Sequence, residues 1–385
     1  MPPKVQSVAL NGLFLSPGDS GGPETYLREI IKALATEYPG LRMTLFTTRS
    51  GSRALEADGY SDLVRLRGLP AEEYRRAQRQ FGEQVLFPFG ARRSAQLAHS
   101  LASTGPMHTP GLPSVVTLHD VTFLHIPTFG RITTWGMKQV ITRAARDADA
   151  LISGSVAARD DVCRTLRLDP TRFTVAPHGM GAIPRAKLAD EADLRQRLGL
   201  EEGRRLALCV AAIRPHKNQE VLVRALASLP ADLDLVLAGR HEPYADHVER
   251  LARELGVKAR LRMAGFLPDS ELERLWEIAD VAVLPTLAEG FGLPLLEAMA
   301  RGLPTACSDI PVLREVGGEL PAYFDAHDPA GAARAVQTLL ERPPPGDPAR
   351  VRAARFSWSA AARGTMEAYE RALARSTSSL PRPWR

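Results

Sequence analysis

Short apolar runs recur along the chain, and amphipathic stretches separate them. In the first half these runs lie at residues 5–10, 43–47, 114–118, 148–152 and 173–176. In the second half they lie at residues 206–213, 233–237, 260–264, 281–284 and 305–307. Runs without alternating polar positions are typical of strands buried on both faces, as in a parallel sheet covered by helices. The pattern therefore predicts an α/β protein with two doubly wound parallel sheets.

Helices are expected between these runs. The first follows a glycine-rich loop and places its apolar residues on one face, at positions 26, 27, 30, 31 and 34. Another is expected to begin after residue 268, with Asp269 or Ser270 as its N-cap. The last, an amphipathic helix at 358–374, is long enough to cross back onto the first half of the protein.

Two domains are expected, because one hydrophobic core rarely serves more than about 250–300 residues and the chain has 385. The polar stretch 180–205 contains no strand-like run, so we place the boundary near residue 182. The predicted parts are an N-terminal domain at 1–182, a C-terminal domain at 183–357, a helix at 358–375 that returns to the N-terminal domain, and a disordered tail at 376–385.

The largest group of candidate ligand-binding residues follows the apolar run at 281–284. The chain passes there through a glycine-broken loop at 289–292 into a helix that starts near Pro294. The first-turn N–H groups and the helix dipole favour an anion. Glu289 and Glu297 flank this turn, and their carboxylates can accept hydrogen bonds from ribose or sugar hydroxyls. A sugar-nucleotide site is predicted, with an ordinary strand–turn–helix unit as the alternative.

Two cations follow the first apolar run of the second half. Arg214 and Lys217 lie in the loop after residues 206–213, at the end of a strand where the ligand crevice of a parallel sheet opens. Arg can bind phosphate in bidentate fashion, and Lys acts as a point charge. Both are therefore predicted to bind a diphosphate.

The first half offers candidates of the same kind. His119 follows the run at 114–118 and is predicted to touch substrate near the reacting carbon, with a structural histidine as the alternative. Gly21 and Gly22 would let the backbone approach a ligand closely, unless the loop is an ordinary connection. The fingerprint G-x-G-x-x-G is absent, which argues against a dehydrogenase.

Composition narrows the class of protein. The three cysteines lie far apart and show neither metal-ligand spacing nor a disulfide framework, which indicates a reducing compartment. No signal peptide is visible, and no apolar run approaches the ~18 residues of a membrane span, so the cytoplasm is expected. The net charge of +5 is modest, and no aromatic-rich basic module for nucleic acid is present.

Positive charge is concentrated in residues 65–93, which hold seven arginines against three glutamates with large apolar residues between them. This composition favours peripheral contact with an anionic membrane, such as the inner membrane face, or binding of an acceptor. A solvated helix face is the alternative.

In their order along the chain, these motifs resemble the retaining glycosyltransferases of family 4, which have the two-domain GT-B fold. The resemblance spans nearly the whole chain. Its motifs are Gly21-Gly22, Leu118-His119-Asp120, Ser153, Arg214 with Lys217-Asn218, Gly265-Phe266-Leu267-Pro268, and Glu289 with Glu297.

The resemblance implies two Rossmann-like domains facing an interdomain cleft. It implies retaining hexosyl transfer without a cofactor, as in mannosyltransferases of polysaccharide biosynthesis. The sequence shows no carboxylate cluster with metal-ligand character, so metal independence is expected. The donor would be a nucleoside diphosphate sugar: GDP-mannose first, with UDP-glucose, UDP-N-acetylglucosamine and dTDP-rhamnose also open. The acceptor would be a hydroxyl of a glycan, a lipid-linked sugar or a small molecule.

It also implies a role for each motif. Arg214 and Lys217 would neutralise the diphosphate with the N–H groups of Phe291, Gly292 and Leu293. Glu297 would hold the ribose, and Glu289 would face the donor sugar. The base would lie against Gly265, Phe266 and Leu267. His119 would contact the sugar near the bond that breaks.

His178 departs from the family pattern, because many members have Asn at this position. The departure leaves the acceptor side open. Two other classes also remain: a pyridoxal-dependent phosphorylase of similar architecture, for which Lys217 is the only lysine within a motif, and a non-catalytic nucleotide-sugar-binding protein.

Overall fold

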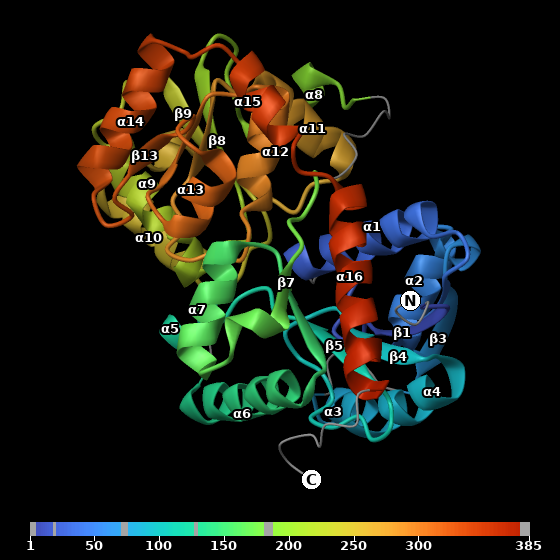
Figure 1. The fold of residues 1–385 in the computed structure, drawn as a ribbon. Coiled ribbons are helices and arrows are strands. Elements are labelled where there is room, and N and C mark those ends of the chain that lie inside the picture. Colours follow the sequence, from blue (N-terminus) through green and yellow to red (C-terminus); the bar gives the residue numbers. More distant parts are fainter. Residues whose placement is uncertain (1–4, 18–20, 71–75, 127–129, 181–187, 378–385) are drawn as a thin grey trace. The chain divides into compact units, whose positions relative to one another are not determined.

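The structure is a computed structural model that describes residues 5–17, 21–70, 76–126, 130–180 and 188–377. It divides into two compact units (Figure 1): unit 1 comprises Met1–Gly179 and Ser357–Arg385, and unit 2 comprises Met180–Phe356. Each unit contains one parallel sheet with helices packed on it, which confirms the predicted α/β fold. The linker predicted near residue 182 and residues 378–385 of the predicted tail lie outside the described residues. The prediction of a disordered tail from residue 376 is wrong for Ser376 and Thr377, which are the last two residues of the C-terminal helix.

Unit 1 is built on seven parallel strands in the order β3-β2-β1-β4-β5-β6-β7. Their bounds are β1 Ser7–Asn11, β2 Arg42–Thr48, β3 Arg65–Leu69, β4 Leu97–Ser100, β5 Ser114–Thr117, β6 Ala150–Ser153 and β7 Phe173–Val175. Every residue of β1, β4, β5 and β6 is buried, as continuous apolar runs predict. The chain moves outward from β1 to β3 and then returns to β4 on the other side of β1, which creates a topological switch point between β1 and β4.

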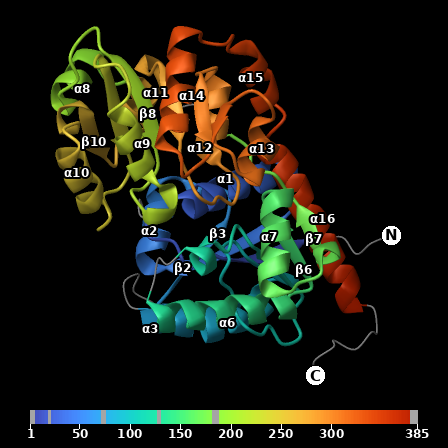
Figure 2. The same cartoon turned by 90° about the vertical axis from the view of Figure 1, so that its left-hand side faces the viewer.

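Helices cover this sheet and connect its strands (Figure 2). They are α1 Gly22–Glu37, α2 Arg49–Ala57, α3 Arg76–Phe81, α4 Phe87–Ser94, α5 Thr122–His125, α6 Arg131–Asp147 and α7 Val156–Leu166. A π-helical turn, η2 at Gly82–Leu86, joins α3 to α4. No helix of the described ranges is both long and apolar enough to span a membrane.

The C-terminal helix α16, Trp358–Thr377, belongs to unit 1, as the sequence predicts. It packs against α1, and Tyr369 and Met366 join Ile30 and Leu34 in one buried apolar cluster. A helix more than 170 residues away in sequence from the last strand of unit 1 thus completes the core of that unit.

The chain leaves unit 1 and returns to it at one point. Gly179 is the last residue before unit 2, and Ser357 is the first residue after it. A Cβ atom on Gly179 would lie 2.2 Å from the backbone nitrogen of Trp358, so only glycine allows the two chain segments to approach this closely.

Unit 2 has six parallel strands in the order β10-β9-β8-β11-β12-β13. The strands are β8 Arg205–Val210, β9 Leu233–Ala238, β10 Leu261–Gly265, β11 Val281–Leu284, β12 Thr305–Ser308 and β13 Ala322–Phe324. The helices are α8 Glu191–Leu198, α9 Gln219–Leu226, α10 Ala245–Glu254, α11 Asp269–Ile278, α12 Leu293–Arg301, α13 Pro311–Gly317, α14 Pro329–Glu341 and α15 Asp347–Ala353. The first strand, β8, pairs with both β9 and β11, so the switch point of this sheet lies between β8 and β11.

Two local expectations differ from the structure. The strand expected at 206–213 ends at Val210. The predicted cap of α11 is wrong, because Pro268 is the N-cap residue and Asp269 is already helical. Three strands were not anticipated, β3, β4 and β13, because their sequences are short or interrupted by polar residues.

Candidate active site

The candidate residues of unit 2 meet at the switch point of its sheet. Strands β8 and β11 are neighbours, so the loop 211–218 and the loop 285–292 leave the sheet side by side at its carboxyl edge. Open α/β sheets bind ligands at this position, because the loops diverge there and leave a crevice. The topology thus brings together Arg214, Lys217 and Glu289, which are far apart in sequence.

Specific hydrogen bonds hold the two loops against each other. The Thr286 hydroxyl donates to the His216 carbonyl at 3.1 Å, and the Leu287 N–H donates to the same oxygen at 2.8 Å. The Asn218 side chain donates to the carbonyl oxygens of Pro285 and Ala326 at 3.0 and 2.8 Å. Asn218 has a φ of 55°, a left-handed conformation that Asn tolerates better than most residues. These bonds fix the backbone that carries Lys217.

Each of the two cations has a carboxylate partner. Lys217 Nζ lies 2.5 Å from Glu289 Oε1, and both side chains are largely buried. Arg214 donates from Nε and a terminal nitrogen to the same Glu242 oxygen, at 3.2 and 2.7 Å. Glu242 follows β9 in the same sheet edge and was not anticipated, although its place after a predicted strand is a signal that sequence analysis could have used. The site is therefore a set of two ion pairs.

The turn before α12 has the geometry of an anion site. Gly292 has a φ of 89°, and a Cβ there would lie 2.6 Å from a Leu313 methyl group, so the turn requires glycine. Its carbonyl accepts from Leu295 and Leu296, which starts the helix. The N–H groups of Gly292 and Leu293 make no hydrogen bond to any residue that the structure describes. They remain available at the positive end of the helix dipole.

Phe291 precedes Gly292 in this turn. Its side chain is buried and packs edge-on against Phe356, with ring centroids 5.7 Å apart. Pro294 is the second residue of α12 and Gly302 ends the helix in a left-handed conformation, close to the predicted bounds.

Glu297 lies one turn into α12, where its side chain is half-buried between buried neighbours of the same helix. Burial raises the pKa of its carboxyl to about 7, with smaller contributions from the nearby carboxylates of Glu273 and Asp269 and an opposing one from Arg301. Arg301 forms an ion pair with Glu273 and lies over the Trp276 ring. The positive charge of Arg301 is therefore divided between Glu273 and Glu297. With a pKa of about 7, Glu297 is a mixture of acid and carboxylate near neutral pH.

The loop after β10 lies at the same carboxyl edge, two strands from β8. Gly265 has a φ of 70°, and its carbonyl accepts from Gly239 N–H at 2.8 Å. Leu267 is buried and Phe266 is exposed. An exposed aromatic ring on a fixed loop offers a stacking surface for a flat ligand.

In unit 1, His119 follows β5 near the switch point of that sheet. Its Nε2 lies 2.9 Å from the Leu101 carbonyl, which can only accept, so Nε2 carries the proton. Burial lowers the pKa of His119, and the ring is therefore neutral at pH 7. Nδ1 then carries a lone pair and can accept a hydrogen bond from a hydroxyl group.

A buried polar network supports the position of His119. Thr117 Oγ1 lies 3.2 Å from the Tyr26 hydroxyl and 2.8 Å from His99 Nε2, and His99 Nδ1 lies 2.8 Å from the Tyr369 hydroxyl. Burial lowers the pKa of His99 to about 3, so this ring is neutral as well. The network links α1, β4, β5 and α16 with hydrogen bonds that a buried polar group requires.

The family-atypical His178 packs beside His119. Its ring stacks on Trp358 at 5.5 Å and lies 4.9 Å from Tyr26 and 5.6 Å from His119. Burial, followed by the proximity of His119, lowers the pKa of His178 well below its ordinary value. His178 is therefore a neutral ring within an aromatic cluster at the point where the chain leaves unit 1.

Gly21 and Gly22 lie at the start of α1. Gly21 is its N-cap residue with a φ of 56°, and its carbonyl accepts from Glu24 and Thr25. Both glycines are exposed, and a Cβ on either would meet no atom within 4 Å. The positive φ explains glycine at position 21, whereas the close approach of a ligand to this loop stays a prediction.

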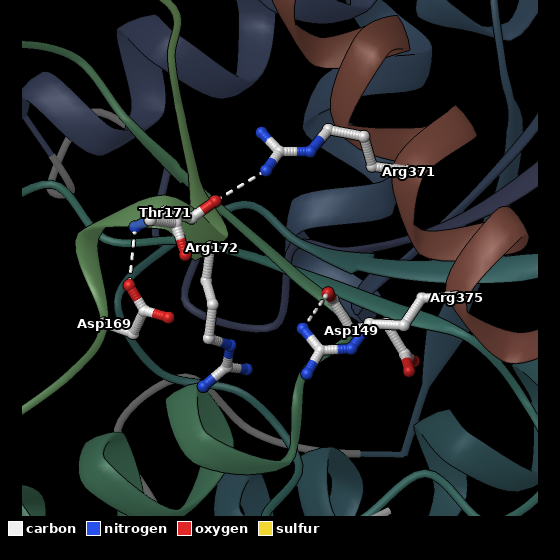
Figure 3. A pocket seen from close by; sticks show the side chains of 6 residues that line it. All are labelled: Asp149, Asp169, Thr171, Arg172, Arg371 and Arg375. Atoms are coloured by element: carbon white, nitrogen blue, oxygen red, sulfur yellow. Dashed lines mark hydrogen bonds between the residues drawn. The ribbon is translucent and has the colours of Figure 1, made fainter. Parts of the chain in front are cut away.

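A separate pocket of about 310 Å³ lies at the amino ends of β6 and β7 (Figure 3). Its arginines are engaged with backbone oxygens: Arg371 donates to Thr171, Arg375 to Asp149, and Arg172 to the last carbonyls of α6. The pocket is on the sheet edge opposite to His119. These contacts fasten α16 to the sheet, and the candidate catalytic residues of unit 1 lie elsewhere.

Comparison with known proteins identifies the family. Residues 20–180 match the model of Glycosyltransferase Family 4, and residues 190–357 match that of Glycosyl transferases group 1. A D-inositol 3-phosphate glycosyltransferase of Thermomonospora curvata is 30% identical, over 85% of this chain and 84% of that protein. The MMP alpha-(1->4)-mannosyltransferase of Mycolicibacterium hassiacum is 32% identical, over 63% and 58% of the two chains.

The fold has solved counterparts. The Anabaena protein HepE, crystallised with UDP and glucose, aligns with a TM-score of 0.72 over 94% of this chain and 98% of that one, at 18% identity. The two parallel-sheet units, the order of the motifs and the matches over both halves lead to one conclusion: the chain belongs to the family 4 glycosyltransferases and has the GT-B fold.

Proposed function

We propose that the protein transfers a hexose from a nucleoside diphosphate sugar to an acceptor hydroxyl, with the donor bound at the switch point of unit 2. The observation that carries the proposal is the convergence of Arg214, Lys217 and the N-terminus of α12 at the carboxyl ends of β8 and β11. Two cations and two available N–H groups match the charge and the oxygens of a diphosphate.

Each site residue receives a role in this proposal. Arg214, Lys217 and the N–H groups of Gly292 and Leu293 stabilise the charge that develops on the diphosphate as the sugar–phosphate bond breaks. Glu297 accepts from the ribose hydroxyls, and Glu289 faces the donor sugar. The base lies against Gly265, Phe266 and Leu267.

On the side of unit 1, His119 accepts a hydrogen bond through Nδ1 from a hydroxyl of the donor sugar. The neutral ring avoids placing a positive charge beside an oxocarbenium-like carbon. Gly21 and Gly22 provide a loop on which substrate can lie close to the backbone.

We propose a retaining, metal-independent reaction. The acceptor oxygen forms a bond to the anomeric carbon on the face that the diphosphate leaves, and the departing phosphate oxygen takes the acceptor proton. Fixed cations and a helix terminus would supply the electrostatic stabilisation that a metal ion supplies in other transferases.

For the donor, GDP-mannose is our first candidate, because one of the relatives is a mannosyltransferase. UDP-glucose is the next, because a structural counterpart holds UDP and glucose; UDP-N-acetylglucosamine and dTDP-rhamnose complete the panel. The acceptor is a glycan, a lipid-linked sugar or a small molecule, a class that includes the inositol phosphate named for one relative. Residues 65–93 are proposed to contact the acceptor or a membrane.

A thermal-shift panel of nucleoside diphosphates and their sugars tests the donor class, because a ligand that binds the native protein raises its stability. The selected donor is then incubated with candidate acceptors, and products are identified by mass spectrometry. A donor-dependent shift with product supports the proposal. A shift without transfer or donor hydrolysis would instead favour a non-catalytic binder, and an absorbance band at about 330–420 nm would reveal pyridoxal phosphate.

A further inference from the structure

The most exposed large apolar side chains of unit 1 gather on two helical segments. On the continuous run from α3 through η2 to α4, Phe81, Val85 and Phe89 point to solvent, and Phe89 is 64% exposed. On α6, Ile132 and Trp135 are 87% and 66% exposed. Each segment thus carries its own group of neighbouring exposed apolar residues, and such groups mark interaction surfaces, whereas isolated residues do not.

The two segments lie at the same end of unit 1. In both Figure 1 and Figure 2, α3 and α6 run along the lower margin of this unit. The loop 105–108 connects them: Gln84 of η2 exchanges hydrogen bonds with Gly105 and Met107 at 3.0 and 2.8 Å. His108 then pairs with Asp147 at the carboxyl end of α6 at 2.6 Å, whereas Ile132 and Trp135 lie near the amino end of the same helix. We call this set of helices and loop the α3–α6 surface.

The charge of this surface is strongly positive. Five exposed cations accompany the apolar residues: Arg92, Arg93, Arg131, Lys138 and Arg143. None of the five forms an ion pair with a carboxylate in the part of the chain that the structure describes. The Arg93 guanidinium lies over the Phe89 ring, 3.4 Å from its centroid, so a cation and an aromatic ring lie together on this surface.

The acidic residues of the same segments are turned inward or neutralised. Glu83 is buried and accepts from Asn11 and Thr104. Asp147 is paired with His108. The face that meets solvent therefore presents cations and apolar rings with little opposing charge.

We propose that the α3–α6 surface docks on an anionic lipid bilayer. Ile132, Trp135 and the α3–α4 side chains would enter the boundary between headgroups and acyl chains, where tryptophan is favoured. The five cations would meet the anionic headgroups. A second copy of the chain fits less well, because it would bring the same positive charge. The inference extends the basic stretch 65–93 to α6, whose role its sequence did not reveal, and it does not depend on the identity of the sugar donor.

Vesicle binding tests the proposal with the full-length protein. Phosphatidylglycerol–phosphatidylcholine vesicles should sediment it, and phosphatidylcholine vesicles should not. Trp384 is replaced by Phe for the fluorescence measurement, which leaves Trp135 and the buried Trp276 and Trp358. Binding should then shift tryptophan emission to the blue, and adding Trp135→Phe should remove most of that shift. Lys138→Glu should weaken binding by roughly 10–30-fold, because each charge near an anionic surface contributes about 1 kcal/mol. Ile132→Ser should weaken it as well.

Matched controls lie in unit 2. Arg342→Glu makes the same charge change, and Val351→Ser removes an exposed apolar side chain; both should bind vesicles like the wild type. Unfolding curves of all variants verify that they are folded. Equal binding to both vesicle types, or undiminished binding by folded Lys138→Glu, would overturn the proposal. So would a concentration-dependent dimer that Trp135→Phe and Ile132→Ser dissolve, because the surface would then be an interface between copies.

Discussion

Arg214 and Lys217 do not stand alone at the end of β8, since each is held by a carboxylate. Ligand phosphate must compete with Glu242 for the arginine and with Glu289 for the lysine. The two pairs differ in burial: the Lys217–Glu289 pair is the more enclosed, so its charges are less screened by water. The loss of Lys217 would therefore leave a poorly solvated carboxylate in the donor site.

Lys217→Ala should lower kcat/KM by roughly 100-fold or more, which corresponds to about 3 kcal/mol of transition-state stabilisation. The variant removes a charge that is proposed to meet the leaving diphosphate. Lys258→Ala is the matched control, because Lys258 pairs with Glu249 away from the site. Wild-type turnover by Lys217→Ala would remove this lysine from the mechanism.

Glu242→Gln should tighten binding of the nucleoside diphosphate by roughly 2–5-fold, since a partly exposed ion pair of this kind contributes up to about 1 kcal/mol. The neutral side chain no longer competes for the Arg214 guanidinium. Titration calorimetry measures the effect, with Asp232→Asn as the control, because Asp232 pairs with Arg205 at the opposite edge of the sheet. Weaker binding would mean that Glu242 orients Arg214 for its ligand.

Glu297 gives the site a pH signature. The folded-state pKa of about 7 lies above the ordinary 4.5, so the folded protein retains a proton that the unfolded chain releases. The stability from this group is complete below about pH 4.5 and is lost as the pH rises through 7. Glu297→Gln stays neutral, and its free energy of unfolding relative to wild type should rise by about 1–3 kcal/mol between pH 5 and pH 8.5.

Denaturant unfolding at both pH values checks this expectation. The exposed Glu367 on α16 supplies the control, and Glu367→Gln should follow the wild type at each pH. Parallel curves for Glu297→Gln and wild type would show that the carboxyl has an ordinary pKa in the folded protein.

At the scale of elements, unit 1 is completed by α16 and by the close approach of Gly179 to Trp358, which we call the Gly179 crossing. The helix contributes Tyr369 and Trp358 to the core; Tyr369 contacts His99, and Trp358 stacks on His178, whose ring lies beside His119. Residues that are remote from the reacting groups in sequence therefore set the position of a candidate catalytic side chain.

Gly179→Ala should destabilise the protein by about 1–3 kcal/mol, because its Cβ would overlap the backbone at Ser357 and Trp358 and the two segments would have to separate. Gly40→Ala is the matched control, since a Cβ at Gly40 meets nothing within 4 Å. Thermal or urea unfolding of both variants checks the prediction. Equal stability would mean that the crossing is looser than described.

The limits of sequence interpretation are also clearest at this scale. Continuous apolar runs predicted the strands β1, β8, β9 and β11 because these strands are buried on both faces. The central strand β4 was missed, since His99 and Ser100 look polar in sequence but are buried and hydrogen-bonded in the sheet. The predicted cap of α11 is wrong, because Pro268 is the N-cap residue and the helix begins at Asp269, one residue earlier than a cap at Asp269 requires.

The site residues also fall into those that could be predicted from the sequence and those that could not. Glycines, cations and carboxylates that follow strands in sequence could be predicted, because the carboxyl edge of a parallel sheet collects such loops. Glu242, Tyr26 and His178 were not assigned to the site. Their roles arise from pairing with Arg214 or from rings that meet across α1 and α16, and such contacts are invisible before the chain folds.

For the molecule as a whole, two parallel-sheet units divide the chemistry. Unit 2 carries the cations, the α12 turn and Glu297, whereas unit 1 carries His119 and the cationic α3–α6 surface. Family membership holds across both units, because the two family models match residues 20–180 and 190–357 in turn.

Crystals of the protein with the nucleoside diphosphate sugar that the stability panel selects provide the most direct measurement. We predict diphosphate density within about 3 Å of Arg214, Lys217 and the N–H of Leu293, with the Arg214–Glu242 contact broken. Diphosphate density elsewhere in a crystal of an enzyme that turns over this donor would contradict the assignment of the donor site to the switch point between β8 and β11.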